Sequence, residues 1–253
     1  MATAADRAKG PARTSVWLGG KAARTPRADQ PAGLSLEKIT AAAVRLLDSE
    51  GLSKFSMRRL ASELGVTAMS VYWYVDTKDD LLELALDAVL GELSIPDLDD
   101  GGQWRGQLRQ LASGYRAVLV RHPWVSRLIG EFLNIGPHAV AFSAAAQRVM
   151  RSSGLPLHGQ AGGLSAVYQF VYGFGTVEGH FRDRCERAGM SQDAYFRQAM
   201  GTISEQPRLR ETFEETQNVR EAGGGDTVEE MRERDFRFAL DLLIAGIEAK
   251  RAG

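Results

Sequence analysis

The sequence predicts an all-α protein with an N-terminal three-helix helix-turn-helix domain and a C-terminal helical domain. Apolar residues recur at helical spacing along most of the chain, and no strand–helix alternation accompanies them. Ser and Thr residues suited to begin helices precede several of these stretches. Residues 56–75 have the layout of two short helices joined by a tight turn. Together these three observations predict the all-α fold class.

The first 33 residues are expected to form a disordered tail. They hold six basic and two acidic side chains and are rich in Ala, Gly and Pro. The basic side chains are Arg7, Lys9, Arg13, Lys21, Arg24 and Arg27.

The first helix is expected to begin at Ser35 and to stop at Gly51. Its apolar residues fall on one face: Leu36, Ile39, Ala43, Leu46 and Leu47.

The next two helices form the helix-turn-helix layout. Ser56 is placed to cap the first and Thr67 the second, and Gly65 between them permits a left-handed turn. Val71 and Val75 then face the core. The outer side of the second helix and its margins are left with small, hydroxyl and aromatic residues: Thr67, Ala68, Met69, Ser70, Tyr72, Trp73 and Tyr74.

Surface rings in a row are hard to explain without a binding partner. The second helix of a helix-turn-helix enters the DNA major groove, so this pattern predicts DNA binding. The alternative is an ordinary helical bundle whose exposed rings have no function.

A longer helix follows over 78–93. Thr77 with Asp80 three residues later is a variant of the capping box, and the acidic residues suit a helix N-terminus.

Beyond residue 94 the pattern predicts further helices separated by Gly and Pro. A loop over 95–102 precedes a helix that starts near Trp104 and breaks at His122-Pro123. The expected later helices span about 124–133, 138–153, 159–182 and 227–250, the last with a capping box at Thr227 and Glu230.

Residues 183–226 are polar and charged. One short helix anchored by Tyr195, Phe196 and Met200 is expected there, with a mobile loop over about 203–226.

Residues 34–93 resemble the N-terminal domain of the tetracycline-repressor (TetR) family of bacterial transcription regulators. The strongest motif is Val71-Tyr72-Trp73-Tyr74-Val75 followed by Lys78, Leu81 and Leu82. The other matching residues are Ile39, Ala42, Leu46, Leu47, Gly51, Leu52, Ser56, Met57, Arg58, Leu60, Ala61, Leu64, Gly65 and Val66.

The resemblance implies a ligand-responsive homodimeric repressor that binds a palindromic DNA operator and is released by a small-molecule effector. It divides the chain into the tail 1–33, a DNA-binding domain 34–80 and an effector-binding and dimerisation domain 81–253. In the family, helices corresponding to 159–182 and 227–250 form a four-helix bundle across the dimer axis. The alternative is that both helices are buried inside one subunit.

The resemblance also assigns roles to residues of the first domain. Arg58 is expected to contact a guanine or clamp a phosphate, and Lys78 to pair with a phosphate. The start of the second helix is expected to face base edges, and Tyr72 and Trp73 the sugar–phosphate backbone. Tyr74 is expected at a base or a phosphate. The predicted DNA-binding residues are Arg58, Thr67, Ala68, Met69, Ser70, Tyr72, Trp73, Tyr74 and Lys78.

The basic tail has two open interpretations. It lies along phosphates or in the minor groove, as homeodomain arms do, or it is a solvated leader.

The effector is expected to be hydrophobic or aromatic. The candidate residues are His122, Trp124, Phe132, His138, Phe142, Tyr168 and Tyr172, and for each of them plain core packing is an equal alternative. The four histidines lie far apart without metal-ligand spacing, so neither a metal nor another cofactor is expected.

Composition limits the remaining classes of function. The net charge of −1 argues against indiscriminate nucleic-acid binding, and the single cysteine excludes an intrachain disulfide. No apolar run is long enough to span a membrane, and no signal core begins the chain, so a cytoplasmic protein is expected. Hydrolase, nucleotide-binding and metalloprotease motifs are missing, which argues against an enzyme. The open alternative is an architectural protein or a regulator controlled by a protein partner, or an activator.

Overall fold

The computed structural model describes residues 15–18, 33–97, 103–206, 208–209, 213 and 227–252. The described chain is helical and contains no strand, which confirms the all-α prediction. It divides into two compact units: Met1–Ile95 with Trp124–Ala145, and Pro96–Pro123 with Ala146–Gly253. The functional boundary at residue 80 stays a prediction. None of the described helices is long and apolar enough to cross a membrane.

The core of the first unit lies between α2 (Leu36–Glu50) and α5 (Lys78–Leu90). Helix α2 begins where Ser35 Oγ accepts the Lys38 amide, and it ends at Gly51, whose φ of 77° suits glycine. It buries Ile39 and Leu47, among others. The expected limits of this helix are confirmed.

Helix α5 begins with the predicted capping box of Thr77 and Asp80. It ends at Leu90, three residues before the expected residue 93. Gly91 is a poor helix former, and the amides of Glu92 and Leu93 bond three residues back in a tightened turn. The expectation of a helix to residue 93 is therefore wrong.

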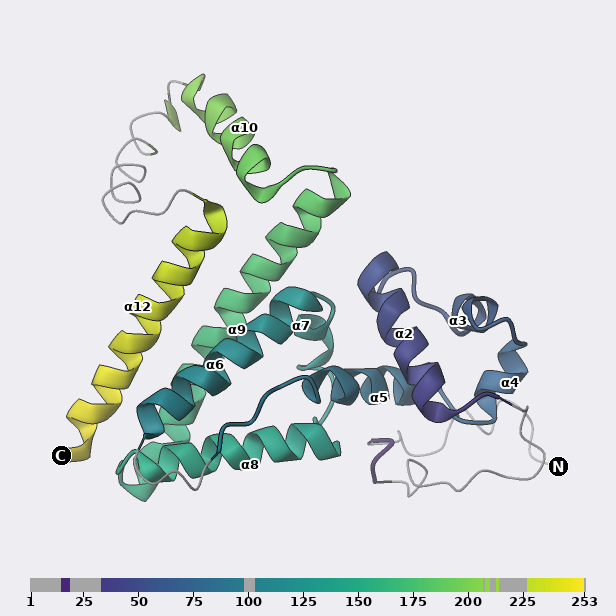
Figure 1. Cartoon of the computed structure of the whole chain (residues 1–253), viewed down its shortest axis with the longest axis horizontal. Helices are drawn as coiled ribbons and strands as arrows, with labels where there is room; N and C mark the ends of the chain where they lie inside the picture. Colours follow the sequence, from purple (N-terminus) through teal and green to yellow (C-terminus); the bar gives the residue numbers. More distant parts are fainter. Residues whose placement is uncertain are drawn as a thin grey trace. The chain divides into compact units, whose positions relative to one another are not determined.

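The short helices α3 (Met57–Glu63), α4 (Ala68–Tyr72) and α7 (Val125–Leu128) complete the first unit with the start of α8 (Pro137–Ser152) (Figure 1). A helix over 124–133 was expected, and α7 is only four residues long. The amides of Glu131 and Phe132 both turn back to the Leu128 carbonyl. Asn134, with a φ of 52°, then donates its side-chain amide to two carbonyls of the turn, which ends the helix.

The second unit is built on α6 (Trp104–Arg121) and α9 (Leu157–Arg187), which lie side by side (Figure 1). Two glycines of α9 allow the backbones to approach closely. A Cβ built at Gly175 would lie 3.0 Å from the Leu119 Cβ, and one built at Gly179 would lie 2.6 Å from the Leu119 carbonyl oxygen. The second distance is shorter than real contacts, so glycine is required there.

Helix α12 (Val228–Ala249) packs on α9 and begins with the predicted Thr227–Glu230 capping box. It runs into the short helix η1 (Lys250–Ala252). The Phe236 ring lies between Phe170 and Phe174 of α9, with ring centroids 5.4 and 5.3 Å away. These rings join α9 and α12.

The polar region after residue 182 is more ordered than the composition indicates. Helix α9 continues to Arg187, supported by Arg182–Glu186 and Asp183–Arg187 pairs four residues apart. Helix α10 (Gln192–Ser204) begins at the Ser191 cap. The expected helix anchored by Tyr195, Phe196 and Met200 is therefore present as α10, whereas the expectation of a loop directly after residue 182 is wrong as far as Arg187. Most of the loop expected over 203–226 lies outside the described residues.

The tail expected over 1–33 also lies mostly outside the described residues. Within it, Ser15–Leu18 are described, and Ser15 and Val16 are buried against Glu83 of α5. The expectation of disorder is wrong for these four residues, because the backbone and the serine hydroxyl bind a buried carboxylate.

Candidate nucleic-acid interface

Local hydrogen bonds hold α3 and α4 in the predicted helix-turn-helix layout. Ser56 Oγ accepts the Arg59 amide, and Thr67 Oγ1 accepts the Ser70 amide, each at 3.2 Å. Gly65 has a φ of 67°, and the Val66 amide bonds to the Ala61 carbonyl to close the turn. Both caps and the glycine turn are confirmed.

One face of α4 is fixed by the core and the other is open to solvent. Val71 is fully buried, and Val75 just beyond the helix is buried as well. On the outer side Met69 is 68% exposed, Trp73 48% and Tyr72 42%. Thr67 is exposed, and Ala68 and Ser70 are half-buried. The structure therefore presents rings, hydroxyls and small side chains together on one surface.

Arg58 lies on α3 with its side chain exposed, and it forms no ion pair with another described residue. Its neighbour Arg59 differs, because it pairs with Glu50 at 2.7 Å and Glu63 at 3.4 Å. These two carboxylates raise the pKa of Arg59, the hydrogen bond to Glu50 most of all. Arg58 is thus the arginine of this pair that is available to a ligand.

Tyr74 and Lys78 are both engaged inside the unit. The Tyr74 hydroxyl donates to the Leu34 carbonyl at 2.8 Å, which fixes the chain before α2. The Lys78 ammonium donates to the Phe55 carbonyl at 3.0 Å and lies 5.6 Å from the Phe55 ring centroid. Each therefore braces the helix-turn-helix, and their expected DNA contacts stay predictions.

The expected effector residues are divided between the two units. Trp124, Phe132, His138 and Phe142 belong to the first, and His122, Tyr168 and Tyr172 to the second. The buried Trp124 donates its indole N–H to Asp48 of α2 at 2.7 Å, and the exposed His138 has its Nδ1 3.0 Å from the Asp87 carboxylate. Phe132 and Phe142 are half-buried, and His122 is buried. Their role with an effector stays a prediction.

Tyr168 and Tyr172 lie one turn apart on α9, beside a residue that the sequence did not single out. Tyr115 of α6 is fully buried, stacks on Tyr168 with ring centroids 5.1 Å apart, and donates its hydroxyl to the Tyr168 oxygen at 2.9 Å. Burial raises the pKa of Tyr115, and the neighbouring tyrosines add to the rise. Both phenols therefore stay protonated at neutral pH. The feature of the sequence that could have indicated this contact is Tyr115 itself, a tyrosine among the apolar residues that recur at helical spacing along α6.

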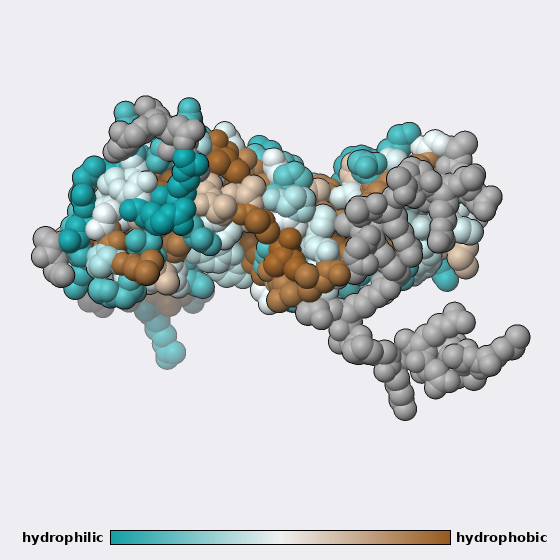
Figure 2. Space-filling view, turned by 90° about the horizontal axis from the view of Figure 1, so that it is seen from below, coloured by the Kyte–Doolittle hydropathy of each residue, from teal (hydrophilic) through white to brown (hydrophobic). Residues whose placement is uncertain are grey.

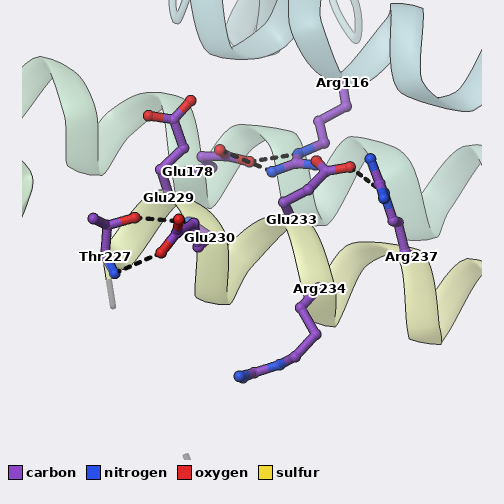
Figure 3. A pocket seen from close by; sticks show the side chains of 8 residues that line it. All are labelled: Arg116, Glu178, Thr227, Glu229, Glu230, Glu233, Arg234 and Arg237. Carbon is purple, nitrogen blue, oxygen red and sulfur yellow. Dashed lines mark hydrogen bonds and ion pairs between the residues drawn. The ribbon is translucent and has the colours of Figure 1, made fainter. Parts of the chain in front are cut away.

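A cluster of charges joins three helices of the second unit (Figure 3). Arg116 of α6 donates to both oxygens of Glu178 of α9, at 2.7 and 3.0 Å, and to Glu233 of α12 at 2.5 Å. Arg237 contacts the other oxygen of Glu233. The Arg116 guanidinium also lies 4.5 Å from the Phe236 ring centroid.

An open cavity of about 780 Å³ borders this cluster. It is lined by Arg116, Glu178, Thr227, Glu229, Glu230, Glu233, Arg234 and Arg237, which include none of the seven expected effector residues. This cluster was not among the predicted site residues, although an arginine inside the buried stripe of a helix indicates a charged partner. Among the described residues, no group of three or more His, Cys, Asp or Glu side chains is placed to hold a metal ion.

Large apolar side chains also reach the surface. On α12, Phe238 is 67% exposed and Leu242 60%, on the side opposite the buried Phe236 and Leu240, and Val177 of α9 is 69% exposed. Figure 2 shows hydrophobic patches among hydrophilic surface on the face seen from below. Exposed apolar side chains that lie together on a helix face are typical of protein interfaces.

The capped helix-turn-helix with its exposed α4 surface defines a DNA-binding regulator. Comparisons with known proteins specify the family. Residues 39–85 match the model of the bacterial regulatory proteins of the tetR family, and residues 95–251 match the tetracyclin repressor-like C-terminal domain. The chain therefore belongs to the TetR family of transcriptional regulators.

Similar proteins include two curated transcriptional regulators and one solved structure. An HTH-type transcriptional regulator of Saccharopolyspora erythraea is 33% identical over 85% of each chain. The HTH-type transcriptional repressor DrrR1 of Streptomyces coeruleorubidus is 31% identical over 96% of this chain and 88% of its own. The crystal structure of Streptomyces coelicolor ActR in complex with actinorhodin is 28% identical, with a TM-score of 0.67, and covers 87% of this chain and 97% of its own.

Proposed function

We propose that this protein is a homodimeric cytoplasmic repressor that binds a palindromic operator and is released by a small, largely aromatic effector. The observation that carries the proposal is the outer surface of α4, where Met69, Tyr72 and Trp73 stand in solvent on a helix anchored by Val71. Apolar rings exposed in this way lose contact with water when they lie against DNA sugars and base edges, while the hydroxyl and indole N–H bond to phosphates.

Operator binding is tested with DNA from the promoter of the protein's own gene. Fluorescence anisotropy at low and raised salt is expected to detect binding that Trp73→Ala weakens strongly. Tyr195→Ala, which removes a ring from α10 in the other unit, is the matched control and is expected to bind like the wild type. Failure of the wild-type protein to bind any promoter fragment at low salt would refute the proposal.

Dimerisation is supported by the exposed apolar sides of α9 and α12. Phe238 and Leu242 lie one turn apart on α12, so they form a continuous stripe, and Val177 adds a second apolar surface on α9. A second copy of the chain offers the same stripes, as a two-fold interface requires. Two recognition helices held one turn of DNA apart, about 34 Å, then match a palindrome.

The effector proposal is supported by the relative ActR, whose structure contains actinorhodin, and by the tyrosines of α6 and α9 in this chain. Tyr115 donates to Tyr168, so the Tyr168 proton is left to donate to a ligand oxygen, beside the ring of Tyr172. To move the operator from almost fully bound to almost fully free, the effector must prefer the released form by about 5.5 kcal/mol.

Effector release is tested by titrating the protein–operator complex with actinorhodin and simpler hydroxyquinones. Loss of anisotropy at ligand concentrations that also quench tryptophan fluorescence is the expected result. Binding of operator that no such compound reverses would favour the alternative, a regulator controlled by a protein partner.

A further inference from the structure

The segment Ser15–Leu18 lies ahead of the helix-turn-helix and outside both regions that match the family. Its sequence is Ser-Val-Trp-Leu, and it forms a turn in which the Trp17 amide bonds to Ser15 Oγ at 3.2 Å. Ser15 and Val16 are both more than nine-tenths buried. This degree of burial shows that the segment is docked on the first unit.

The segment is held by hydrogen bonds to the carboxylate of Glu83 on α5. Val16 donates its backbone N–H to Glu83 Oε2 at 2.8 Å, and the Ser15 hydroxyl donates to Oε1. Glu83 is itself buried. A buried carboxylate is unfavourable unless donors satisfy it, so the segment and Glu83 depend on each other.

Trp17 extends the contact along α5. It lines a narrow hollow together with Leu86, Asp87 and Asn134. The indole Nε1 and the Asn134 Oδ1 that line this hollow are both buried, and neither has a hydrogen-bond partner among the described residues. The side-chain nitrogen of Asn134 already donates to the Ile129 and Phe132 carbonyls. Its side-chain oxygen is therefore the atom that can still accept a hydrogen bond.

Three buried acidic side chains, spaced three and four residues apart on one face of α5, each accept hydrogen bonds from backbone amides. Asp80 accepts the Asp76 and Thr77 amides at the end of the recognition segment. Glu83 accepts the Val16 amide, and Asp87 accepts the Ala139 amide at the start of α8 at 2.9 Å. The docked segment is therefore one of three backbone attachments along α5, and the attachment at Asp80 holds the chain that follows α4.

We propose that Ser15–Trp17 is an intramolecular latch on α5, and that Glu83 is a positioning residue which, through this latch, holds the DNA-reading helices in the operator-binding arrangement. The proposal rests on the operator binding proposed above. Glu83 itself makes no contact with DNA. It acts by keeping the helix that follows α4 in one place.

The test compares Glu83→Gln and Ser15→Ala with Glu131→Gln in full-length protein. Glu131→Gln removes the same charge from an exposed position of the same unit. Operator affinity is measured well below the melting temperature, so that all variants are folded. Glu83→Gln removes the charge of the buried acceptor and Ser15→Ala removes one of its two donors, so about tenfold weaker binding is expected for each. Glu131→Gln is expected to bind like the wild type.

Two further readouts separate positioning from plain stabilisation. Amide hydrogen exchange of Val16 and Trp17 is expected to be slow in the wild type and fast in Glu83→Gln. The double variant, Glu83→Gln with Ser15→Ala, is expected to bind operator about as well as whichever single variant binds it less tightly. Both changes break the same contact, so their effects do not add. Lower melting temperatures with unchanged operator affinity would overturn the latch, as would fast exchange at Val16 in the wild type.

The outcome for the wild type separates the two proposals. If the wild-type protein binds no operator, the proposed function fails. If it binds and Glu83→Gln binds equally well, the proposed function stands and the latch is refuted.

Discussion

Neighbouring side chains at the end of α4 have opposite surroundings, because Val71 is buried whereas Tyr72 and the following Trp73 are in solvent. A helix of five residues is too short to be stable by itself. It persists because Val71 is packed in the core and Thr67 caps its first turn. The exposed rings are therefore held in place by a buried valine and a local cap, which reduces the entropy that they would lose on binding a partner.

Arg58 gives a prediction for a single side chain. Arg58→Ala is expected to weaken operator binding by about 1–3 kcal/mol and to relax the preference at one base position, as for a bidentate guanine contact. Anisotropy with operators substituted at each position measures both effects.

Arg59→Ala is the control, since Arg59 is already paired with Glu50 and Glu63. It is expected to leave base preference unchanged. Unaltered affinity in Arg58→Ala would remove this residue from the interface.

The candidate site was partly predictable at this scale. The exposure of Met69, Tyr72 and Trp73 follows from helix periodicity around Val71, which the sequence displays directly. The engagement of Tyr74 with Leu34, 40 positions earlier, depends on tertiary contact and leaves no local pattern. The same holds for the pairing of Tyr115 with Tyr168, because any aromatic residue in a buried stripe gives the same periodicity.

At the scale of elements, the beginnings of helices were more predictable than their ends. Ser35, Ser56, Thr67, Thr77 and Thr227 all cap the helices expected of them, because a cap is a bond between residues three apart. Helix α7 is shorter than expected because the Asn134 amide closes a turn after it. Helix α9 is longer because ion pairs support its polar end.

Close approach of α6 and α9 gives a prediction about packing. Gly179→Ala is expected to destabilise the protein by about 1–3 kcal/mol, because the new Cβ would press on the Leu119 carbonyl oxygen of α6. Thermal or denaturant unfolding measures the change.

Gly162→Ala in the same helix is the control, because nothing lies within 4 Å of its Cβ position. It is expected to stabilise by about 0.5–1 kcal/mol, since alanine is the better helix former. Equal effects of the two substitutions would contradict the close approach.

The charge cluster of α6, α9 and α12 predicts a dependence of stability on pH. Burial acts to raise the pKa of Glu233, but hydrogen bonds from Arg116 and Arg237 outweigh it, and the pKa is lowered. A carboxyl whose folded pKa is lowered stabilises the fold above its unfolded pKa of about 4.3 and loses this contribution as the pH falls through the folded value. Stability is therefore expected to decline below about pH 5.

Melting curves between pH 3.5 and pH 7 check this expectation. Glu233→Gln is expected to flatten the decline. Arg109→Ala is the control, since its partner Asp241 is exposed and such surface pairs contribute about 0–1 kcal/mol. An unchanged pH profile in Glu233→Gln would contradict the assignment.

At the scale of the whole molecule, the exposed apolar stripe of α12 predicts the oligomeric state. The double substitution Phe238→Glu and Leu242→Glu is expected to give monomers, because it places charges in the middle of an apolar interface. Light scattering coupled to size-exclusion chromatography measures the mass, and operator affinity is expected to fall with it.

Val140→Glu is the control, because it places the same charge on an exposed apolar residue of the first unit. It is expected to leave the mass unchanged. A dimer that survives the double substitution in α12 would mean that another surface joins the subunits.

Cys185 lies near the end of α9, fully buried, and it is the single cysteine of the chain. Burial raises the pKa of its thiol, which keeps it protonated and slow to react. The wild-type protein thus contains its own chemical reporter, since a maleimide can alkylate this sulfur only when the surrounding helices separate. The alkylation rate with and without operator, followed by mass spectrometry, would time that opening without any label or substitution.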